Sequence, residues 1–396
     1  MRHIVICILL TFSYSLNSNA RSEYALNEKL NCSACHVTAW GAGPRTTYGK
    51  VYGSHGNKMS KLSESDVYYA DLRMIGYRPT HPSKTVNGFA LMTAAPSANV
   101  RVYEGARSSE VRLVYTFNSS PLGGTYAREA YVAWQPEQPE AEAGNTPARL
   151  VLGRFNFPFG LLTDEHRAYT RIQSRTPLEN YEMGAAISVN IVSDFHFDFA
   201  LVNDLESGGS FSNQNVTFGS ILNARFNPSQ IPIFIGSSGM YGYVLNTPKP
   251  YALSYYAGIS LDQMTRSKVS GSLLFERVDS WNQPADRSGS IHPNVNTFFG
   301  LNLSGVGSHS VGYYSQAKWE LNSRWVLFYR FDYYKQDTQI SNNSFARHGL
   351  GFETYLPGNL IFNFRGEKAA LGNTPAGPNE PLAAQNDVLA MIRCWI

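Results

Sequence analysis

Residues 324–334 read RWVLFYRFDYY, and two kinds of side chain alternate along them. Successive side chains of an extended strand point to opposite faces. On one face of such a strand lie Trp325, Leu327, Tyr329, Phe331 and Tyr333. On the other face lie Arg324, Arg330 and Asp332. The stretch therefore predicts a β-strand with one aromatic, apolar face and one charged face.

The same period of two recurs along the chain. Val111, Leu113, Tyr115 and Phe117 alternate with Glu110, Arg112 and Thr116; Phe195, Phe197, Phe199 and Leu201 alternate with His196, Asp198 and Asp204; and Leu360, Phe362 and Phe364 alternate with Asn363, Arg365 and Glu367. Polar turns at 320–323 and 356–359 join some of these runs into hairpins. A secreted β-sandwich or β-helix also alternates. The aromatic character of the apolar faces and the length of the strands, about ten residues, favour an all-β, antiparallel transmembrane β-barrel.

The strands between Asp66 and Ile396 number about sixteen, and a bacterial barrel has an even number. Counting back from the last strand, 388–396, places the short turns on the periplasmic side and the long segment 369–385 outside. The long segment 279–293 falls on the wrong side in this count, which indicates one strand too many or too few there. The chain ends in Trp395-Ile396, and barrels commonly close on an aromatic residue. Cys394 shares a face with Ile392, which predicts an inert, lipid-facing thiol.

The first twenty residues have the features of a secretory signal peptide. Arg2 precedes an apolar run from Ile4 to Leu10, and Ser18-Asn19-Ala20 fits a cleavage site of small residues. The run is too short to span a bilayer. Cleavage after Ala20 removes Cys7. The sequence thus predicts export across the inner membrane.

Residues 32–36 read Cys32-Ser33-Ala34-Cys35-His36, the Cys-x-x-Cys-His spacing by which a c-type haem is held. Two thiols at this spacing reach the two vinyl groups of one porphyrin, and the adjacent imidazole then lies beneath the iron. A structural zinc site needs a fourth ligand, and no second ligand pair follows nearby. A thioredoxin-like motif belongs where a strand opens a helix, whereas glycine and proline follow here. A structural disulfide leaves His36 without a role. One covalent haem c on Cys32 and Cys35, with His36 as an axial iron ligand, is the prediction.

The sixth iron ligand is not given by the motif. His55 and Met59 lie near enough in sequence to fold back over the iron, and His81 is a third candidate. Met74 shares its face with Leu72 and is opposed by Asp71 and Arg73, so we expect it to point toward lipid.

Composition excludes some functions. The net charge is only +3 and no basic run occurs, so we expect no nucleic-acid partner. No nucleophile or paired-carboxylate motif indicates a hydrolase. Residues 136–144 hold Glu137, Glu140 and Glu142 without a basic residue. They either gather cations such as ferrous iron near the outer mouth or form a solvated Pro-rich loop, and their composition favours the loop.

The haem motif, followed by Gly41-Ala42-Gly43-Pro44-Arg45, Tyr48-Gly49-Lys50 and then a barrel, resembles the fused cytochrome–porin family of outer-membrane electron-transfer proteins known from iron-oxidising bacteria. Arg154-Phe155 with Phe157-Pro158-Phe159-Gly160 also resembles a segment of several porins. The residue patterns together with this resemblance divide the chain into a signal peptide at 1–20, a haem-binding segment at 21–65 and a porin-like barrel of about sixteen strands at 66–396. In that family one haem domain precedes the porin, so Cys32 and Cys35 would be the thioether anchors and His36 the proximal ligand.

The leading hypothesis is therefore an electron carrier of the bacterial outer membrane. It would meet periplasmic carriers such as soluble cytochromes on one side and an extracellular reductant or oxidant on the other. Pairs such as Asp71 with Arg73, Arg330 with Asp332 and Arg365 with Glu367 could join across the lumen and fill it, although paired ladders also line ordinary porins. The alternative is a diffusion porin for small solutes in which the haem cap is structural or gating. A haem enzyme such as a peroxidase needs an open sixth site and a nearby base.

Overall fold

The computed structural model describes residues 68–79, 88–104, 109–120, 124–136, 148–163, 170–171, 174, 176, 181–192, 194–203, 218–228, 231–243, 251–265, 270–281, 309–322, 324–335, 338–339, 344–356, 360–371 and 387–395. These residues form sixteen strands and one short helix. They are β1 (Tyr68–Pro79), β2 (Gly88–Glu104), β3 (Ser109–Ser120), β4 (Gly124–Pro136), β5 (Ala148–Asn156), β6 (Tyr181–Val192), β7 (Phe195–Val202), β8 (Phe218–Phe226), β9 (Ile233–Tyr243), β10 (Tyr251–Ser260), α6 (Leu261–Met264), β11 (Ser270–Trp281), β12 (His309–Glu320), β13 (Trp325–Lys335), β14 (Ser344–Leu356), β15 (Leu360–Leu371) and β16 (Asp387–Trp395). None of the helices within these ranges is long and apolar enough to cross a membrane.

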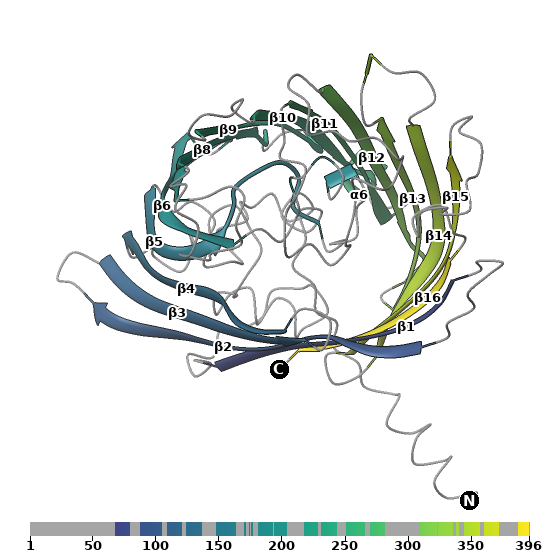
Figure 1. Cartoon of the computed structure of the whole chain (residues 1–396), viewed down its shortest axis with the longest axis horizontal. Helices are drawn as coiled ribbons and strands as arrows, with labels where there is room; N and C mark the ends of the chain where they lie inside the picture. Colours follow the sequence, from purple (N-terminus) through teal and green to yellow (C-terminus); the bar gives the residue numbers. More distant parts are fainter. Residues whose placement is uncertain are drawn as a thin grey trace, which may run out of the picture.

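The strands form one closed barrel in which each strand pairs with its neighbours in sequence. The ring closes where β1 lies antiparallel to β16, in a register that runs from Asp71 opposite Trp395 to Pro79 opposite Asp387. Figure 1 shows the ring along its axis. Closure pairs the backbone groups of every strand and leaves no open edge, which a lipid environment demands. The prediction of an all-β antiparallel barrel of about sixteen strands is confirmed.

The connections differ in length at the two ends of the barrel. One end carries short turns, such as 193–194, 321–324 and 357–359, and β1 begins and β16 ends there. The opposite end carries the connections 157–180, 282–308 and 372–386. Short turns of bacterial barrels face the periplasm and long loops face outward. The apparent misplacement of the segment 279–293 came from the strand count, because β11 continues to Trp281 and its connection to β12 lies at the long-loop end.

The acidic segment predicted from the sequence joins two described strands. Residues 137–147, which contain Glu137, Glu140 and Glu142, are outside the described residues. The strands that they join, β4 and β5, meet at the short-turn end. The role of this acidic segment stays a prediction.

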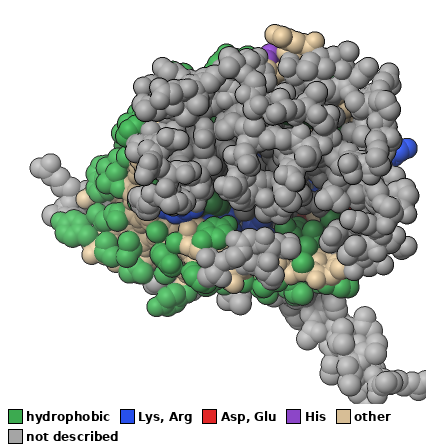
Figure 2. All heavy atoms as spheres, in the orientation of Figure 1, with side chains coloured by type: hydrophobic (Ala, Val, Ile, Leu, Met, Phe, Trp, Pro, Cys, Tyr) green, Lys and Arg blue, Asp and Glu red, His purple; other side chains and the backbone are tan. Residues whose placement is uncertain are grey.

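The outer face of the wall is apolar. Leu113, Tyr115, Leu327 and Tyr329 are each between 40% and 48% exposed, although they are large hydrophobic side chains. Figure 2 shows such side chains gathered around the outside of the wall, with Lys and Arg in view on the inner side. Exposed apolar side chains around a closed barrel are the pattern of a lipid-facing surface. Met74 and Cys394 lie on this face as predicted, since Cys394 pairs with the exposed Leu72.

The inner face is less uniform than the sequence indicated. Arg330 and Asp332 are buried on it, as predicted for β13. The same face of that strand also carries Val326, Phe328 and Tyr334, all buried. The inner wall thus combines polar and apolar regions. The candidate site lies against the apolar region.

Candidate functional site

The connection between β5 and β6 folds into the barrel. We call its described residues 157–163, 170, 171, 174 and 176 the inward segment. The Gly160 amide donates to Ser238 Oγ on β9 at 2.9 Å, and the Leu161 amide donates to Glu276 Oε1 on β11 at 2.9 Å. Thr170 Oγ1 donates to the carbonyl oxygen of Tyr313 on β12 at 2.7 Å. Thr170 Oγ1 also lies 3.2 Å from the carbonyl oxygen of Tyr333 on β13, so contacts of the segment along the inner wall extend from β9 to β13.

Apolar side chains explain why this segment enters the lumen. Phe157, Phe159 and Leu161 are 4%, 1% and 2% exposed. The first two pack in a core cluster with inward residues of β3 to β11, among them Phe155, Ala186, Ala200, Ile221, Met240, Ala252 and Val278. Leu161 packs with Phe234, Tyr256 and Leu274. Burial of each large apolar side chain contributes about 1.5–3 kcal/mol. One side of the lumen is thus a hydrophobic core covered by the inward segment.

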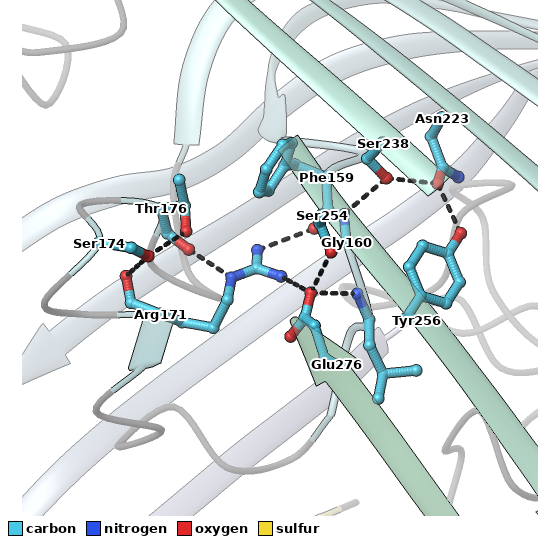
Figure 3. Close-up of polar contacts among 11 residues, drawn as sticks. Phe159, Gly160, Arg171, Ser174, Thr176, Asn223, Ser238, Ser254, Tyr256 and Glu276 are labelled. Carbon is cyan, nitrogen blue, oxygen red and sulfur yellow. Dashed lines mark hydrogen bonds and ion pairs between the residues drawn. The ribbon is translucent and has the colours of Figure 1, made fainter. Parts of the chain in front are cut away.

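A buried ion pair fixes the segment at the middle of this wall. Arg171 Nη1 lies 2.7 Å from Glu276 Oε1, and both side chains are 2% exposed. Arg171 also donates through Nη2 to the carbonyl of Phe159 at 2.8 Å and through Nε to that of Thr176 at 2.6 Å. These contacts tie the start of the segment to its end, and Figure 3 shows the guanidinium between them. We call the Arg171–Glu276 pair the clamp.

The carboxylate of the clamp is well satisfied. Glu276 Oε1 accepts from Arg171, from the Leu161 amide and from Ser254 Oγ at 2.7 Å. A buried charge is tolerated when it is paired and hydrogen-bonded in this way. Because one oxygen of Glu276, on β11, accepts hydrogen bonds from β10 and from two parts of the segment, the position of the segment depends on this side chain.

A polar chain extends from the segment across the neighbouring strands. Ser238, which receives the Gly160 amide, donates to Asn223 Oδ1 at 2.7 Å, and Tyr256 donates to the same oxygen at 2.6 Å. Asn223 Nδ2 donates to Asp198 Oδ2 at 2.8 Å. Asp198 in turn lies 2.8 Å from His196 Nε2. These groups hold the wall beneath the segment in one arrangement.

Gly160 sits at the closest approach between segment and clamp. Its φ is +65°, a conformation that glycine adopts readily and other residues do not. A Cβ there would collide with Arg171 Nη1 and Glu276 Oε1. We expect Gly160→Ala to lower the free energy of unfolding by about 1–2 kcal/mol for the backbone conformation alone, with a further loss from displacement of the clamp. Chemical unfolding in detergent measures the difference.

Gly366→Ala is the matched control for that substitution. Gly366 lies in a strand of the same barrel, and a Cβ there meets nothing within 4 Å. Equal stability of the two variants would contradict the role given to Gly160.

The opposite wall of the lumen is charged. Arg347 Nη2 lies 2.8 Å from Asp332 Oδ2 and its Nη1 lies 3.0 Å from Glu367 Oε2. Arg365 Nε lies 2.7 Å from Glu367 Oε1. Lys318 Nζ lies 3.6 Å from Glu353 Oε2. All of these partners lie on β12 to β15, on the same strand or on nearby strands.

A second charged group lies at the seam between β1 and β16. Asp71 Oδ2 accepts from Arg73 Nη2 at 2.8 Å and from Arg393 Nη2 at 2.9 Å. The predicted pairings of Asp71 with Arg73 and of Arg365 with Glu367 are present. Arg330 donates to Gln316 Oε1 at 3.0 Å. The hypothesis that such pairs join across the lumen is wrong for these groups, because each pair runs along the wall, as in the ladders of porins.

The sequence-predicted haem residues lie outside the described part of the chain. This holds for Cys32, Cys35 and His36, for the sixth-ligand candidates His55 and Met59, and for His81. Within the described ranges, no group of three or more His, Cys, Asp or Glu side chains is arranged to hold a metal ion. Sequence reasoning did not find Arg171 or Glu276. The only signal near them was the motif ending in Phe157-Pro158-Phe159-Gly160, which precedes the clamp.

Comparison with known proteins identifies the architecture. No protein-family model and no curated protein sequence matches the chain. Among solved structures, the outer-membrane channel DcaP of Acinetobacter baumannii matches with a TM-score of 0.58 and 6% identity over 83% of this chain and 96% of that one. The anion-selective porin of Comamonas acidovorans matches with a TM-score of 0.58 and 9% identity over 83% and 98%. OprB of Pseudomonas putida matches with a TM-score of 0.55 and 10% identity over 83% and 94%.

The fold of this chain is that of a porin-like barrel. At such low identities the likeness concerns the fold alone. Together with the apolar outer face, it supports the predicted location in the bacterial outer membrane and the predicted contact with its lipid.

Proposed function

We propose that this protein is an outer-membrane channel for the diffusion of small polar solutes, narrowed by the inward segment. The observation that carries the proposal is the division of the lumen. The segment is clamped to the wall formed by β5 to β11, and it faces a wall whose charges pair along the strands. A passage between an anchored segment and a charged wall admits hydrated solutes and discriminates among them by size and charge. The proposal assigns no catalytic reaction to the chain.

The charged wall favours anions in this proposal. From β12 through β16 to β4, the inward basic residues are Arg73, Arg101, Arg112, Arg128, Lys318, Arg324, Arg330, Arg347, Arg365 and Arg393, and the inward acidic ones are Asp71, Glu129, Glu320, Asp332, Glu353, Glu367 and Asp387. Basic side chains are thus in excess among the described residues. An excess of one sign in a narrow, low-dielectric passage raises the local concentration of the opposite ion.

Planar-bilayer recording of the purified full-length protein tests the proposal. We expect a steady ionic current and, in a KCl gradient, a reversal potential of the sign given by preferential chloride passage. Arg347→Gln removes the cation that bridges two carboxylates and should shift the reversal potential toward cation preference. Lack of steady current would contradict the channel proposal, and preferential potassium passage would contradict the assignment of selectivity.

Electron transfer is the second candidate function, and one specific feature favours it. The two thiols and the imidazole of Cys32, Cys35 and His36 match the donor set and spacing of a c-type haem. When bound, the haem would supply one-electron redox chemistry. In this proposal the two cysteines anchor the porphyrin, His36 binds the iron, and His55 or Met59 supplies the sixth ligand. The chain enters the barrel through β1 at the periplasmic end, so the proposed partner on that side is a periplasmic electron carrier such as a soluble cytochrome.

A further inference from the structure

Among strands β6 to β15, charged side chains and histidines on the outer face are concentrated on β11 to β15. On β6 to β10 the described outward side chains are apolar, small or aromatic, such as Ile187, Leu222, Ile235 and Tyr255. On β11 to β15 the outward positions include the residues that we call the outer basic patch: Arg277, His309, Lys335, His348 and Lys368. A charge on the lipid face is costly at the middle of a bilayer and cheap at its surface. The position of the patch along the strands therefore decides whether its charges lie in hydrocarbon or at the bilayer surface.

Strand register places the patch toward the long-loop end. Trp281 lies opposite His309, Val311 lies opposite Lys335, and Arg277 lies opposite Tyr313. Trp281, His309 and Lys335 are the last or first residues of their strands at that end. Exposed tryptophans Trp319 and Trp325 mark the opposite end of the same wall. Aromatic girdles mark the two bilayer interfaces, so Trp281, His309 and Lys335 lie at the level of the outer-leaflet headgroups. Arg277, His348 and Lys368 lie three or four residues further from that end of their strands, within reach of the same level for long side chains.

Aromatic rings frame the patch. The Trp281 ring stacks on His309 with centroids 4.3 Å apart and on Tyr251 with centroids 4.5 Å apart. The Arg277 guanidinium lies 5.7 Å from the centroid of the Tyr313 ring. Amphipathic rings and arginine in this arrangement suit a boundary between hydrocarbon and polar headgroups.

The balance of charge in the patch is positive. Asp279 is the acidic residue beside the patch, and Arg277 Nε and Nη2 donate to the Asp279 carboxylate at 2.7 and 2.9 Å. Those bonds use two of the five N–H donors of the guanidinium. The Arg277 side chain is 45% exposed, whereas that of Asp279 is 6% exposed. Lys335 and Lys368 add two further cations, so the patch presents positive charge outward with the acid beside it covered.

We propose that the outer basic patch binds the phosphate groups of outer-leaflet lipid. Phosphate oxygens accept hydrogen bonds from guanidinium and ammonium groups, and charge complementarity favours an anionic headgroup. Below the patch the outer face continues through Phe275, Leu273 and Leu350, which are 45%, 41% and 68% exposed. An apolar strip directly beneath a cationic patch fits a molecule with a phosphorylated head and hydrocarbon chains. A lipid is thus favoured over free phosphate.

Native mass spectrometry of the full-length protein in detergent tests this proposal. The probes are lipid A with both phosphates, the same lipid with its phosphates removed, and inorganic phosphate as a competitor. We expect the phosphorylated lipid to bind and the dephosphorylated lipid to bind at least about tenfold more weakly. Lys335→Gln/Lys368→Gln should weaken binding of the phosphorylated lipid by about tenfold or more, since each cation near a charged surface contributes to attraction.

Arg324→Gln is the matched control, because it removes one exposed cation from the opposite end of the same wall. It should bind the phosphorylated lipid as the wild type does. Equal binding of the two lipids, full competition by millimolar inorganic phosphate, or unchanged binding by the double variant would each overturn the proposal. If the double variant changes from one copy to several while its lipid binding stays the same, the patch governs contact between copies of the chain. That outcome would also overturn the proposal. The test is independent of channel activity.

Discussion

Glu276→Gln is expected to destabilise the barrel by about 3–5 kcal/mol and to enlarge its single-channel conductance. The substitution preserves size and leaves the Arg171 cation buried at 2% exposure without its counter-charge. Removal of one partner from a buried ion pair costs far more than the pair contributes as a unit, because the remaining charge is neither paired nor hydrated. The segment can relieve this cost by withdrawing Arg171 toward solvent.

Withdrawal of Arg171 also breaks the bonds to Phe159 and Thr176 that join the ends of the inward segment. The segment then no longer follows the wall, and the passage should widen and become more variable. Single-channel recording measures the conductance, and chemical unfolding in detergent measures the stability of the same preparation.

Two variants separate the clamp from a general loss of stability. Glu353→Gln removes a buried carboxylate that lies 3.6 Å from Lys318 on the charged wall, away from the segment's contacts. It should destabilise the barrel without the same change in conductance. Arg171→Met/Glu276→Leu replaces both charges by apolar groups and should recover much of the stability lost in Glu276→Gln. A Glu276→Gln channel with wild-type conductance would show that the clamp does not set the width of the passage.

The strands were predictable because their outer faces obey a simple rule. Lipid excludes polar side chains over the whole height of the membrane, so Leu113 and Tyr115 or Leu327 and Tyr329 recur at a period of two. The rule failed at β11, where Arg277 and Asp279 occupy outward positions. In the sequence these two charges resemble the beginning of a loop. The count of strands, which must alternate between upward and downward strands, therefore went wrong there. Arg277 belongs to the outer basic patch and Asp279 lies beside it, where the headgroup level accepts charge.

The inner faces were less predictable for a different physical reason. Ala200, Ile221 and Ala252 point inward although the lumen of a channel is expected to be polar. They are apolar because the inward segment covers them, and the segment is a connection without a periodic pattern of its own. The clamp joins Arg171 to Glu276 across a large separation in sequence, so neither residue carries a local sign of its partner. Only the apolar run at Phe157 and Phe159 indicated that this connection avoids water.

The wild-type protein, expressed with its export sequence, is expected to carry covalent haem, and Cys32→Ser/Cys35→Ser is expected to carry none. Each thioether needs one cysteine sulfur, so loss of both sulfurs removes every covalent link while His36 alone holds iron only reversibly. Haem staining after denaturing electrophoresis and the intact mass of the processed polypeptide measure the attachment. Cys394→Ser is the matched control, because Cys394 lies on the outer face of β16 opposite Leu72. It should keep the haem in full.

The same variants separate the two candidate functions. The contacts of the inward segment involve residues 157–176 and strands of the barrel, so Cys32→Ser/Cys35→Ser should fold and conduct ions as the wild type does. If haem serves electron transfer, the double variant should lose all reduction of the protein by periplasmic cytochrome, while Cys394→Ser retains it. A wild-type polypeptide with only its bare peptide mass would refute the haem proposal and leave the channel proposal intact. Loss of conductance in the double variant would instead make the haem part of the channel, because the passage would then depend on a group bound before the first strand begins.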